Sequence, residues 1–408
     1  MNSFLQFILV IIIIITCTKI GGYLSMMLKQ PTVVGELLAG IVLGPTLLDM
    51  MHWSILTDHH LQESINHLGE FGVILLMLLA GMHLHIDDLI ESSKIASLAG
   101  TLGVIAPLFM VWGICILFDI PTEAAIFVGL IMAATSVSIS AQTLMEMGML
   151  RSRIGITMMG AAVIDDILVL LGLSIFTALA TSTTTISFTQ IATILLQMIG
   201  FFTISILIGI MLIPKLTNWI DKLRINQGIY LYVLILTLIY AWSAEVIGGI
   251  AAITGAFLAG LFLGRTKQHE RIINGMSIIA YGMFVPIFFA NIGLQSNARD
   301  ISGNLIWITI AIILVAIISK LVGCSIGARI GGMNTKDALQ VGAGMISRGE
   351  VGLIVASLGL SHGIINQEIF SITVVTVIIV TVVTPLIMYR LARDTTTTNL
   401  NHNTLSKE

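Results

Sequence analysis

The sequence predicts an all-α membrane protein that crosses the bilayer many times. Of its 408 residues, 56% are apolar and only 10% are charged, and the mean hydropathy is +1.02. Soluble domains carry about 25% charged residues, so this composition excludes a water-soluble enzyme. Apolar runs long enough to cross about 30 Å of hydrocarbon recur along almost the whole chain. An ordered internal repeat is the third observation, and it favours a transporter.

Thirteen apolar segments are expected to be transmembrane helices. The first has no basic segment before it and no small-residue cleavage site after it, so we expect an uncleaved span rather than a signal peptide. The polar, Thr-rich tail at 394–408 is expected to be disordered. The thirteen segments lie near residues 4–28, 32–48, 65–84, 95–118, 123–145, 154–180, 188–213, 229–244, 247–264, 273–294, 304–328, 338–360 and 367–389.

Basic residues predict how the chain is oriented. Lys and Arg gather on alternate loops and in the tail, whereas the other loops contain a single basic residue, Arg299. Because cytoplasmic loops are enriched in Lys and Arg, the N-terminus is predicted outside and the C-terminus in the cytoplasm. A multi-pass protein of the cell membrane is therefore expected. The scattered basic residues make no stripe for nucleic acid, so no nucleic-acid partner is expected.

Two halves of the chain share a repeated pattern. GELLAGIVLGP at 35–45 returns as GAFLAGLFLGR at 255–265, with identity at six of eleven positions. LLAGMHL at 78–84 is followed in the same order by FFANIGL at 288–294. The two copies are predicted to cross the membrane in opposite directions, because the second copy lies seven spans after the first. Such an inverted repeat is typical of secondary transporters.

Asp165 and Asp166 are the strongest candidates for function. Asp165 lies twelve residues after Arg153, which places the pair about 18 Å along a helix and near the membrane midplane. A charge at that depth costs about 2.5 to 3.5 kcal/mol, so a charged residue there indicates a functional role. Adjacent helical residues point about 100° apart, so the two carboxylates are expected to have different partners. In a low-dielectric site, a carboxylate can exchange a proton for a cation.

Lys320 is the expected counter-charge for one of these aspartates. It lies nine residues before Arg329, about 14 Å from the cytoplasmic end of its span and close to the depth of the pair. Snorkelling to the interface is the alternative for Lys320, and it is the preferred interpretation for Lys19. Pairing Lys320 with one aspartate would leave the other for a transported ion.

Two spans are predicted to be broken at mid-membrane. ATSVSISAQ at 134–142 favours local backbone hydrogen bonding, and GAGMISRGEVGL at 342–353 contains four glycines. Discontinuous helices at corresponding places in two halves indicate a transporter binding site. Thr135 and Ser136 are expected to donate oxygens to an ion or to break the helix. Arg348 and Glu350 are expected to neutralise one another and the helix ends.

Together these motifs resemble the bacterial monovalent cation:proton antiporters of the second cation-proton antiporter family, of the NapA/GerN type. The resemblance covers nearly all the predicted spans. It depends on the segment at 31–45, ATSVSIS at 134–140, IDD at 164–166, Lys320, and ISRGEV at 346–351.

The resemblance implies a homodimer in which a mobile core moves against a scaffold and the two broken spans cross near the ion. Asp166 then resembles the ion-binding carboxylate, Asp165 the partner of the lysine, and Lys320 that lysine. The scaffold would comprise residues 1–94 and 226–303, the core 95–187 and 304–393, and a linker span 188–225, ahead of the tail.

The predicted function is Na⁺/H⁺ antiport, which the resemblance implies to be electrogenic, and not enzyme catalysis. Asp165 and Asp166 would bind the transported Na⁺, and no cofactor is expected. Two alternatives stay open: a K⁺/H⁺ antiporter of the same family, and a sodium-coupled solute symporter with the same architecture. No cytoplasmic nucleotide-binding domain is expected, because the chain ends shortly after its last span.

Overall fold

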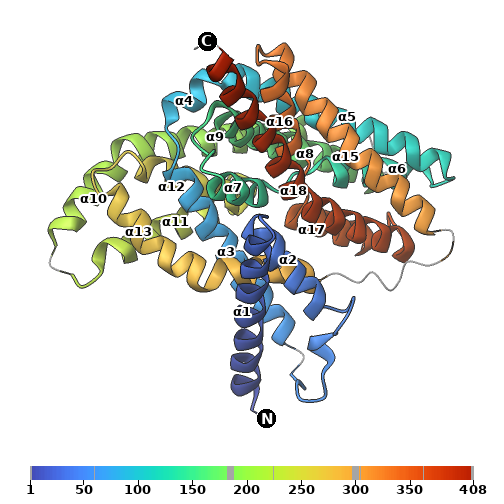
Figure 1. Cartoon of the computed structure of the whole chain (residues 1–408), viewed down its shortest axis with the longest axis horizontal. Coiled ribbons are helices and arrows are strands. Elements are labelled where there is room, and N and C mark those ends of the chain that lie inside the picture. Colours follow the sequence, from blue (N-terminus) through green and yellow to red (C-terminus); the bar gives the residue numbers. More distant parts are fainter. Residues whose placement is uncertain are drawn as a thin grey trace.

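The computed structural model describes residues 2–58, 60–181, 188–223, 225–295, 303, 305–361 and 363–405, and this part of the chain is helical throughout, apart from its connecting turns (Figure 1). Helices of the first half are α1 (Ser3–Met27), α2 (Thr32–Leu43), η1 (Met50–His52), α3 (Leu61–Met82), α4 (Ile86–Glu91), α5 (Ser93–Leu117), α6 (Thr122–Ala133), α7 (Val137–Glu146) and α8 (Arg153–Thr181). Those that follow are α9 (Phe188–Met211), α10 (Ile213–Lys222), α11 (Gly228–Val246), α12 (Ala252–Leu263), α13 (His269–Ile279), the π-helical η2 (Ala280–Phe284), α14 (Val285–Leu294), α15 (Leu305–Ile330), α16 (Thr335–Gly344), α17 (Glu350–Ser361) and α18 (Gln367–Leu405).

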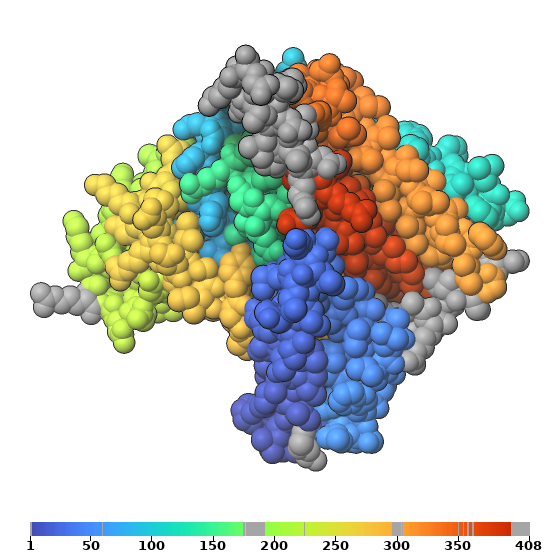
Figure 2. Space-filling view, viewed as in Figure 1, coloured from blue at the N-terminus to red at the C-terminus, as the bar shows by residue number. Residues whose placement is uncertain are grey.

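The helices show a multi-pass membrane protein. Within the described residues, ten helical segments are long and apolar enough to span a bilayer, and α2 and α12 are shorter apolar helices. Large apolar side chains are exposed along α1 and α9, which suits contact with lipid. Figure 2 shows α1 projecting from the rest of the molecule, with the chain that follows α2 beside it.

Three segments differ from the lengths that hydropathy predicts. α2 ends at Leu43, because the Gly44–Pro45 pair that follows cannot continue a helix. α12 begins only at Ala252, after Gly249 with a positive φ of 62°. α18 continues as a helix to Leu405, although disorder is expected from residue 394. Extending a long helix is less costly than nucleating one.

The repeated segments make reciprocal contacts in one half of the molecule. α2 packs on α14, and α12 packs on α3. A methyl group added at Gly40 would collide with the carbonyl oxygen of Ala290, and one added at Gly260 would collide with that of Leu78. Small residues allow helices in lipid to approach backbone to backbone. The repeated glycines therefore fix the two equivalent interfaces.

Gly40→Leu is expected to destabilise the protein by about 1–3 kcal/mol, because the new side chain cannot fit between α2 and α14. Thermal unfolding of purified protein in detergent measures the effect as a lower melting temperature. Gly113→Leu is the matched control, since a Cβ at Gly113 has nothing within 4 Å. Equal melting temperatures for the two variants would contradict the assigned interface.

A second group of helices is built in the same way. α5 packs along α15, α8 packs on α5, and α18 lies against both α15 and α16. The added methyl group at Gly327 would collide with the carbonyl of Leu98, so α5 and α15 also touch backbone to backbone. α7 joins the two groups through contacts with α2 and α3. Both predicted helix breaks belong to the second group.

Candidate ion site

The two broken helices meet at their breaks. α6 ends at Ala133 and α7 begins at Val137, whereas α16 ends at Gly344 and α17 begins at Glu350. The Ser136 amide donates to the Ser347 carbonyl at 3.0 Å, and the Ser347 hydroxyl donates to the Ser136 carbonyl at 2.7 Å. Non-helical backbone in a membrane needs such partners. Each break therefore satisfies polar groups that the other leaves open.

Ser347→Ala is expected to lower the free energy of unfolding by about 1–3 kcal/mol, because the buried Ser136 carbonyl loses a donor. The Ser347 hydroxyl also lies 2.9 Å from the Ser140 hydroxyl. Thermal unfolding in detergent measures the loss. Ser325→Ala is the control, because the buried Ser325 hydroxyl has no hydrogen-bond partner among the described residues. Equal destabilisation by both variants would show that the bridge contributes nothing.

Asp165 and Lys320 form an ion pair that is closed to solvent. Asp165 on α8 and Lys320 on α15 are both 0% exposed, and Lys320 Nζ lies 2.5 Å from Asp165 Oδ1. The ammonium group also donates to the Ala133 carbonyl at 2.7 Å, and the Thr135 amide donates to Asp165 Oδ2 at 3.1 Å. Hydrogen bonds of this kind offset the desolvation of a buried pair. The pair thus joins α8 and α15 to the first helix break.

Asp166 faces a different helix. Its Oδ2 accepts a hydrogen bond from the Thr254 hydroxyl of α12 at 3.3 Å, and 7% of the residue is exposed. The neighbouring aspartates therefore have separate partners, as adjacent helical positions require. Sequence reasoning missed Thr254. The sequence does contain a signal for Thr254, because the repeat aligns this polar residue with the apolar Val34 of the first copy.

Thr135 and Ser136 lie in the first break. The Thr135 hydroxyl is buried and has no hydrogen-bond partner in the described part of the chain. The Ser136 hydroxyl lies 3.0 Å from that of Ser138. The backbone groups of both residues make hydrogen bonds at the helix break. The Thr135 oxygen is in addition an acceptor that a cation could use.

Arg348 lies in the second break and is fully buried. Its guanidinium nitrogens have no hydrogen-bond partner among the described residues. The Arg348 carbonyl accepts a hydrogen bond from the Thr381 hydroxyl of α18. The side chain of Glu350 lies outside the described residues, so the expected neutralisation of Arg348 by Glu350 stays a prediction.

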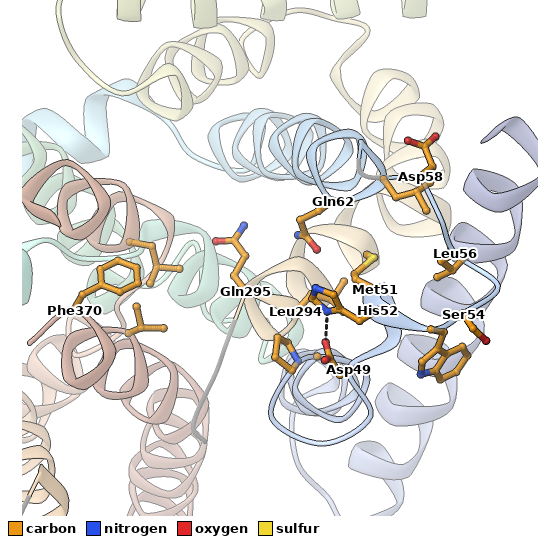
Figure 3. A pocket seen from close by; sticks show the side chains of 16 residues that line it. Asp49, Met51, His52, Ser54, Leu56, Asp58, Gln62, Leu294, Gln295 and Phe370 are labelled. Carbon is orange, nitrogen blue, oxygen red and sulfur yellow. Dashed lines mark hydrogen bonds and ion pairs between the residues drawn. The ribbon is translucent and has the colours of Figure 1, made fainter. Parts of the chain in front are cut away.

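Two cavities lie where the helix groups meet. One of about 670 Å³ has Phe370 on one side and Leu294 on the other (Figure 3), and Gly44, Gln295 and Leu353 also line it. Its rim carries an ion pair between His52 Nδ1 and Asp49 Oδ1 at 2.7 Å, drawn as the dashed line.

The second cavity, of about 530 Å³, is lined by residues of α1, α2 and α7. Here Lys19 lies 3.7 Å from Glu36, and its side chain is 48% exposed, in keeping with the interfacial position expected for Lys19. Glu146 at the end of α7 accepts a hydrogen bond from the Thr32 amide at 2.7 Å. This cavity therefore has a polar contact between α7 and α2 in its wall.

Comparison with known proteins identifies the family. Residues 8–393 match the model described as "Sodium/hydrogen exchanger, transmembrane". The chain belongs to the sodium/hydrogen exchanger family. The exchanger is 39% identical over 381 residues to the Na⁺/H⁺-K⁺ antiporter GerN of Bacillus cereus, covering 93% of this chain and 95% of the relative. It is 35% identical over 384 residues to a Na⁺/H⁺ antiporter of Enterococcus hirae, covering 94% and 97% of the two chains.

The fold of the exchanger also matches a solved structure. The sodium proton antiporter MjNhaP1 of Methanocaldococcus jannaschii superimposes with a TM-score of 0.74 at 16% identity, covering 96% of this chain and 97% of that one. At this identity the likeness shows a shared fold. The relatives are transporters, and the exchanger is likewise not an enzyme.

Proposed function

We propose that the protein exchanges Na⁺ for H⁺ across the cell membrane by alternating access. One observation supports this above the others. Asp165 is paired with Lys320 and accepts a hydrogen bond from the Thr135 amide, while the adjacent Asp166 faces another helix and is 7% exposed. The site therefore holds one neutralised carboxylate and a second with separate surroundings. The Na⁺/H⁺ antiporters that resemble this chain along nearly all its length support the same function.

Asp166 is the proposed carrier of the cargo. Its carboxylate binds either Na⁺ or a proton, and the two compete because both need the same oxygen atoms. The Thr135 hydroxyl supplies a further oxygen. Asp165 contributes to the binding of Na⁺ through its charge and holds Lys320, so that the two buried side chains balance one another. Competition for one carboxylate couples the two ion flows.

The proposed architecture is that of a homodimer with thirteen membrane crossings, its N-terminus outside and its C-terminus in the cytoplasm. The core comprises residues 95–187 and 304–393, and it moves against a scaffold of residues 1–94 and 226–303, with residues 188–225 as linker. The broken helices cross beside the ion. Packing of α5 along α15, and of α2 and α3 on α14 and α12, supports this division.

Two other activities use the same architecture. Exchange of K⁺ for H⁺ has some support, because the printed name of the Bacillus cereus relative includes K⁺. A sodium-coupled solute symporter would need convergent polar groups for its solute beyond the carboxylate pair. The relatives named above favour antiport over symport.

Everted vesicles containing the protein provide the test. Respiration acidifies their interior and quenches a pH-sensitive dye, and added NaCl is expected to restore the fluorescence as protons leave. A response to KCl of equal size at equal concentration would favour K⁺/H⁺ exchange. Absence of any response to NaCl, KCl or LiCl, with the protein detected in the membrane, would overturn the proposed antiport.

A further inference from the structure

Arg348 is a buried charge that the proposed cycle does not use. It is the largest fully buried side chain in the described part of the protein, at 0% exposure. None of its Nε, Nη1 and Nη2 atoms has a hydrogen-bond partner among the described residues. Buried charges are normally paired, because desolvation without compensation is costly. A guanidinium that is buried without a hydrogen-bond partner in the described part of the chain therefore calls for a role.

The backbone that carries Arg348 is fixed to the ion site. Its carbonyl accepts a hydrogen bond from Thr381, and the neighbouring Ser347 binds both polar backbone groups of Ser136. One residue before Ser136, the Thr135 amide binds Asp165. The backbone of Arg348 is thus connected by a short chain of hydrogen bonds to Asp165.

Arg348 adds a second positive charge to a site that Lys320 already neutralises in part. The guanidinium interacts electrostatically with Asp165, Lys320 and the Cys324 thiol. From α18, the uncharged Thr381 contacts the backbone carbonyl of Arg348, and the Glu350 side chain lies outside the described residues. Because Lys320 lies 2.5 Å from Asp165, the charge of Arg348 is not cancelled by that carboxylate alone. A cation that enters the site therefore meets repulsion from both basic side chains.

We propose that Arg348 is a positioning residue whose fixed positive charge weakens cation binding at the buried aspartates, so that the cargo is released on each side of the membrane. The inference extends the proposed antiport and depends on it. Transport requires binding that is strong enough for entry and weak enough for exit. Two unit charges about 10 Å apart, at an effective dielectric constant of about 20, alter affinity by about tenfold.

Three substitutions separate charge from shape. Arg348→Met and Arg348→Gln remove the charge, and both are expected to lower the KM for Na⁺ by about tenfold at one alkaline pH, with a maximum rate that does not rise. Arg348→Lys keeps the charge and is expected to stay within about threefold of the unmodified protein. Thr381→Val is the matched control, because it loosens the same peptide group without changing a charge.

A second measurement does not need transport. Na⁺ is titrated into purified protein in detergent while the melting temperature is followed, and Arg348→Met is expected to reach half of its stabilisation at about tenfold lower Na⁺. Without Na⁺, its melting temperature is expected to equal or exceed that of the unmodified protein, because Met removes a buried charge that has no hydrogen-bond partner among the described residues. A purely structural arginine would instead leave a less stable protein on removal.

The outcomes distinguish the two proposals. An unchanged or raised KM and Na⁺ midpoint in both Arg348→Met and Arg348→Gln would overturn the role of Arg348 and leave the antiport intact. A shift in Arg348→Lys or Thr381→Val as large as in Arg348→Met would overturn it too, since charge would not be the cause. If the unmodified protein neither binds nor moves Na⁺, the proposed function itself is wrong.

Discussion

Asp166→Asn is expected to abolish the Na⁺-induced fluorescence change in everted vesicles, down to the level of vesicles without the protein. Asn has the shape of Asp and keeps an oxygen that can accept the hydrogen bond from Thr254, so the fold is expected to persist. Its amide cannot bind a proton or bear the negative charge that attracts Na⁺. Loss of transport at normal protein level and normal melting temperature is therefore the expected signature.

A second carboxylate provides the control for Asp166. The side chain of Glu70 is 69% exposed, and its Oε2 lies 3.4 Å from His67 Nδ1. Glu70→Gln removes the same charge and is expected to keep the response to NaCl. Full Na⁺-dependent proton movement in Asp166→Asn would remove Asp166 from the transport path.

Breaking the pair of Asp165 and Lys320 is expected to have the largest effect on stability. Lys320→Met removes the ammonium group that is paired with the buried Asp165, and removing one member of a buried ion pair costs about 3–5 kcal/mol. A melting temperature well below that of the unmodified protein is expected.

A double-mutant cycle tests whether the two side chains act on each other. Combining Lys320→Met with Asp165→Asn removes both charges while Asn keeps an acceptor for the Thr135 amide. The double variant is expected to melt above Lys320→Met, because the carboxylate that Lys320 balanced is neutral as well. Additive losses, with the double variant the least stable, would contradict the pairing that the structure shows.

Hydropathy and helix depth predicted much of this molecule. Long apolar runs predicted the spanning helices, and counting residues from Arg153 and Arg329 placed Asp165 and Lys320 at similar depth. Depth along a helix is a local property, because the rise per residue is constant. The breaks at Thr135 and near Arg348 were also visible, since polar and glycine-rich runs interrupt apolar helices.

Contacts between distant segments were not predictable from local patterns. The hydrogen bonds of Ser136 with Ser347, and of Thr254 with Asp166, join residues that are 211 and 88 positions apart. The pattern of apolar residues in one segment carries no information about which distant residue it will contact. Hydropathy also overestimated the length of α2, because an average over apolar residues does not detect that the Gly44–Pro45 pair ends the helix. One residue pair can thus end a helix that averaged hydropathy predicts to continue.

Backbone-to-backbone packing limits which surfaces of this protein can slide. At Gly40 on Ala290, and at Gly327 on Leu98, no side chain lies between the helices to change its rotamer. Sliding of one helix along another proceeds by small side-chain adjustments. These two helix interfaces are therefore expected to stay rigid. Where α7 meets α2, by contrast, Glu146 holds Thr32 by hydrogen bonds that can be exchanged for water. Movement between α7 and α2 is therefore expected to need the release of the Glu146 carboxylate from Thr32.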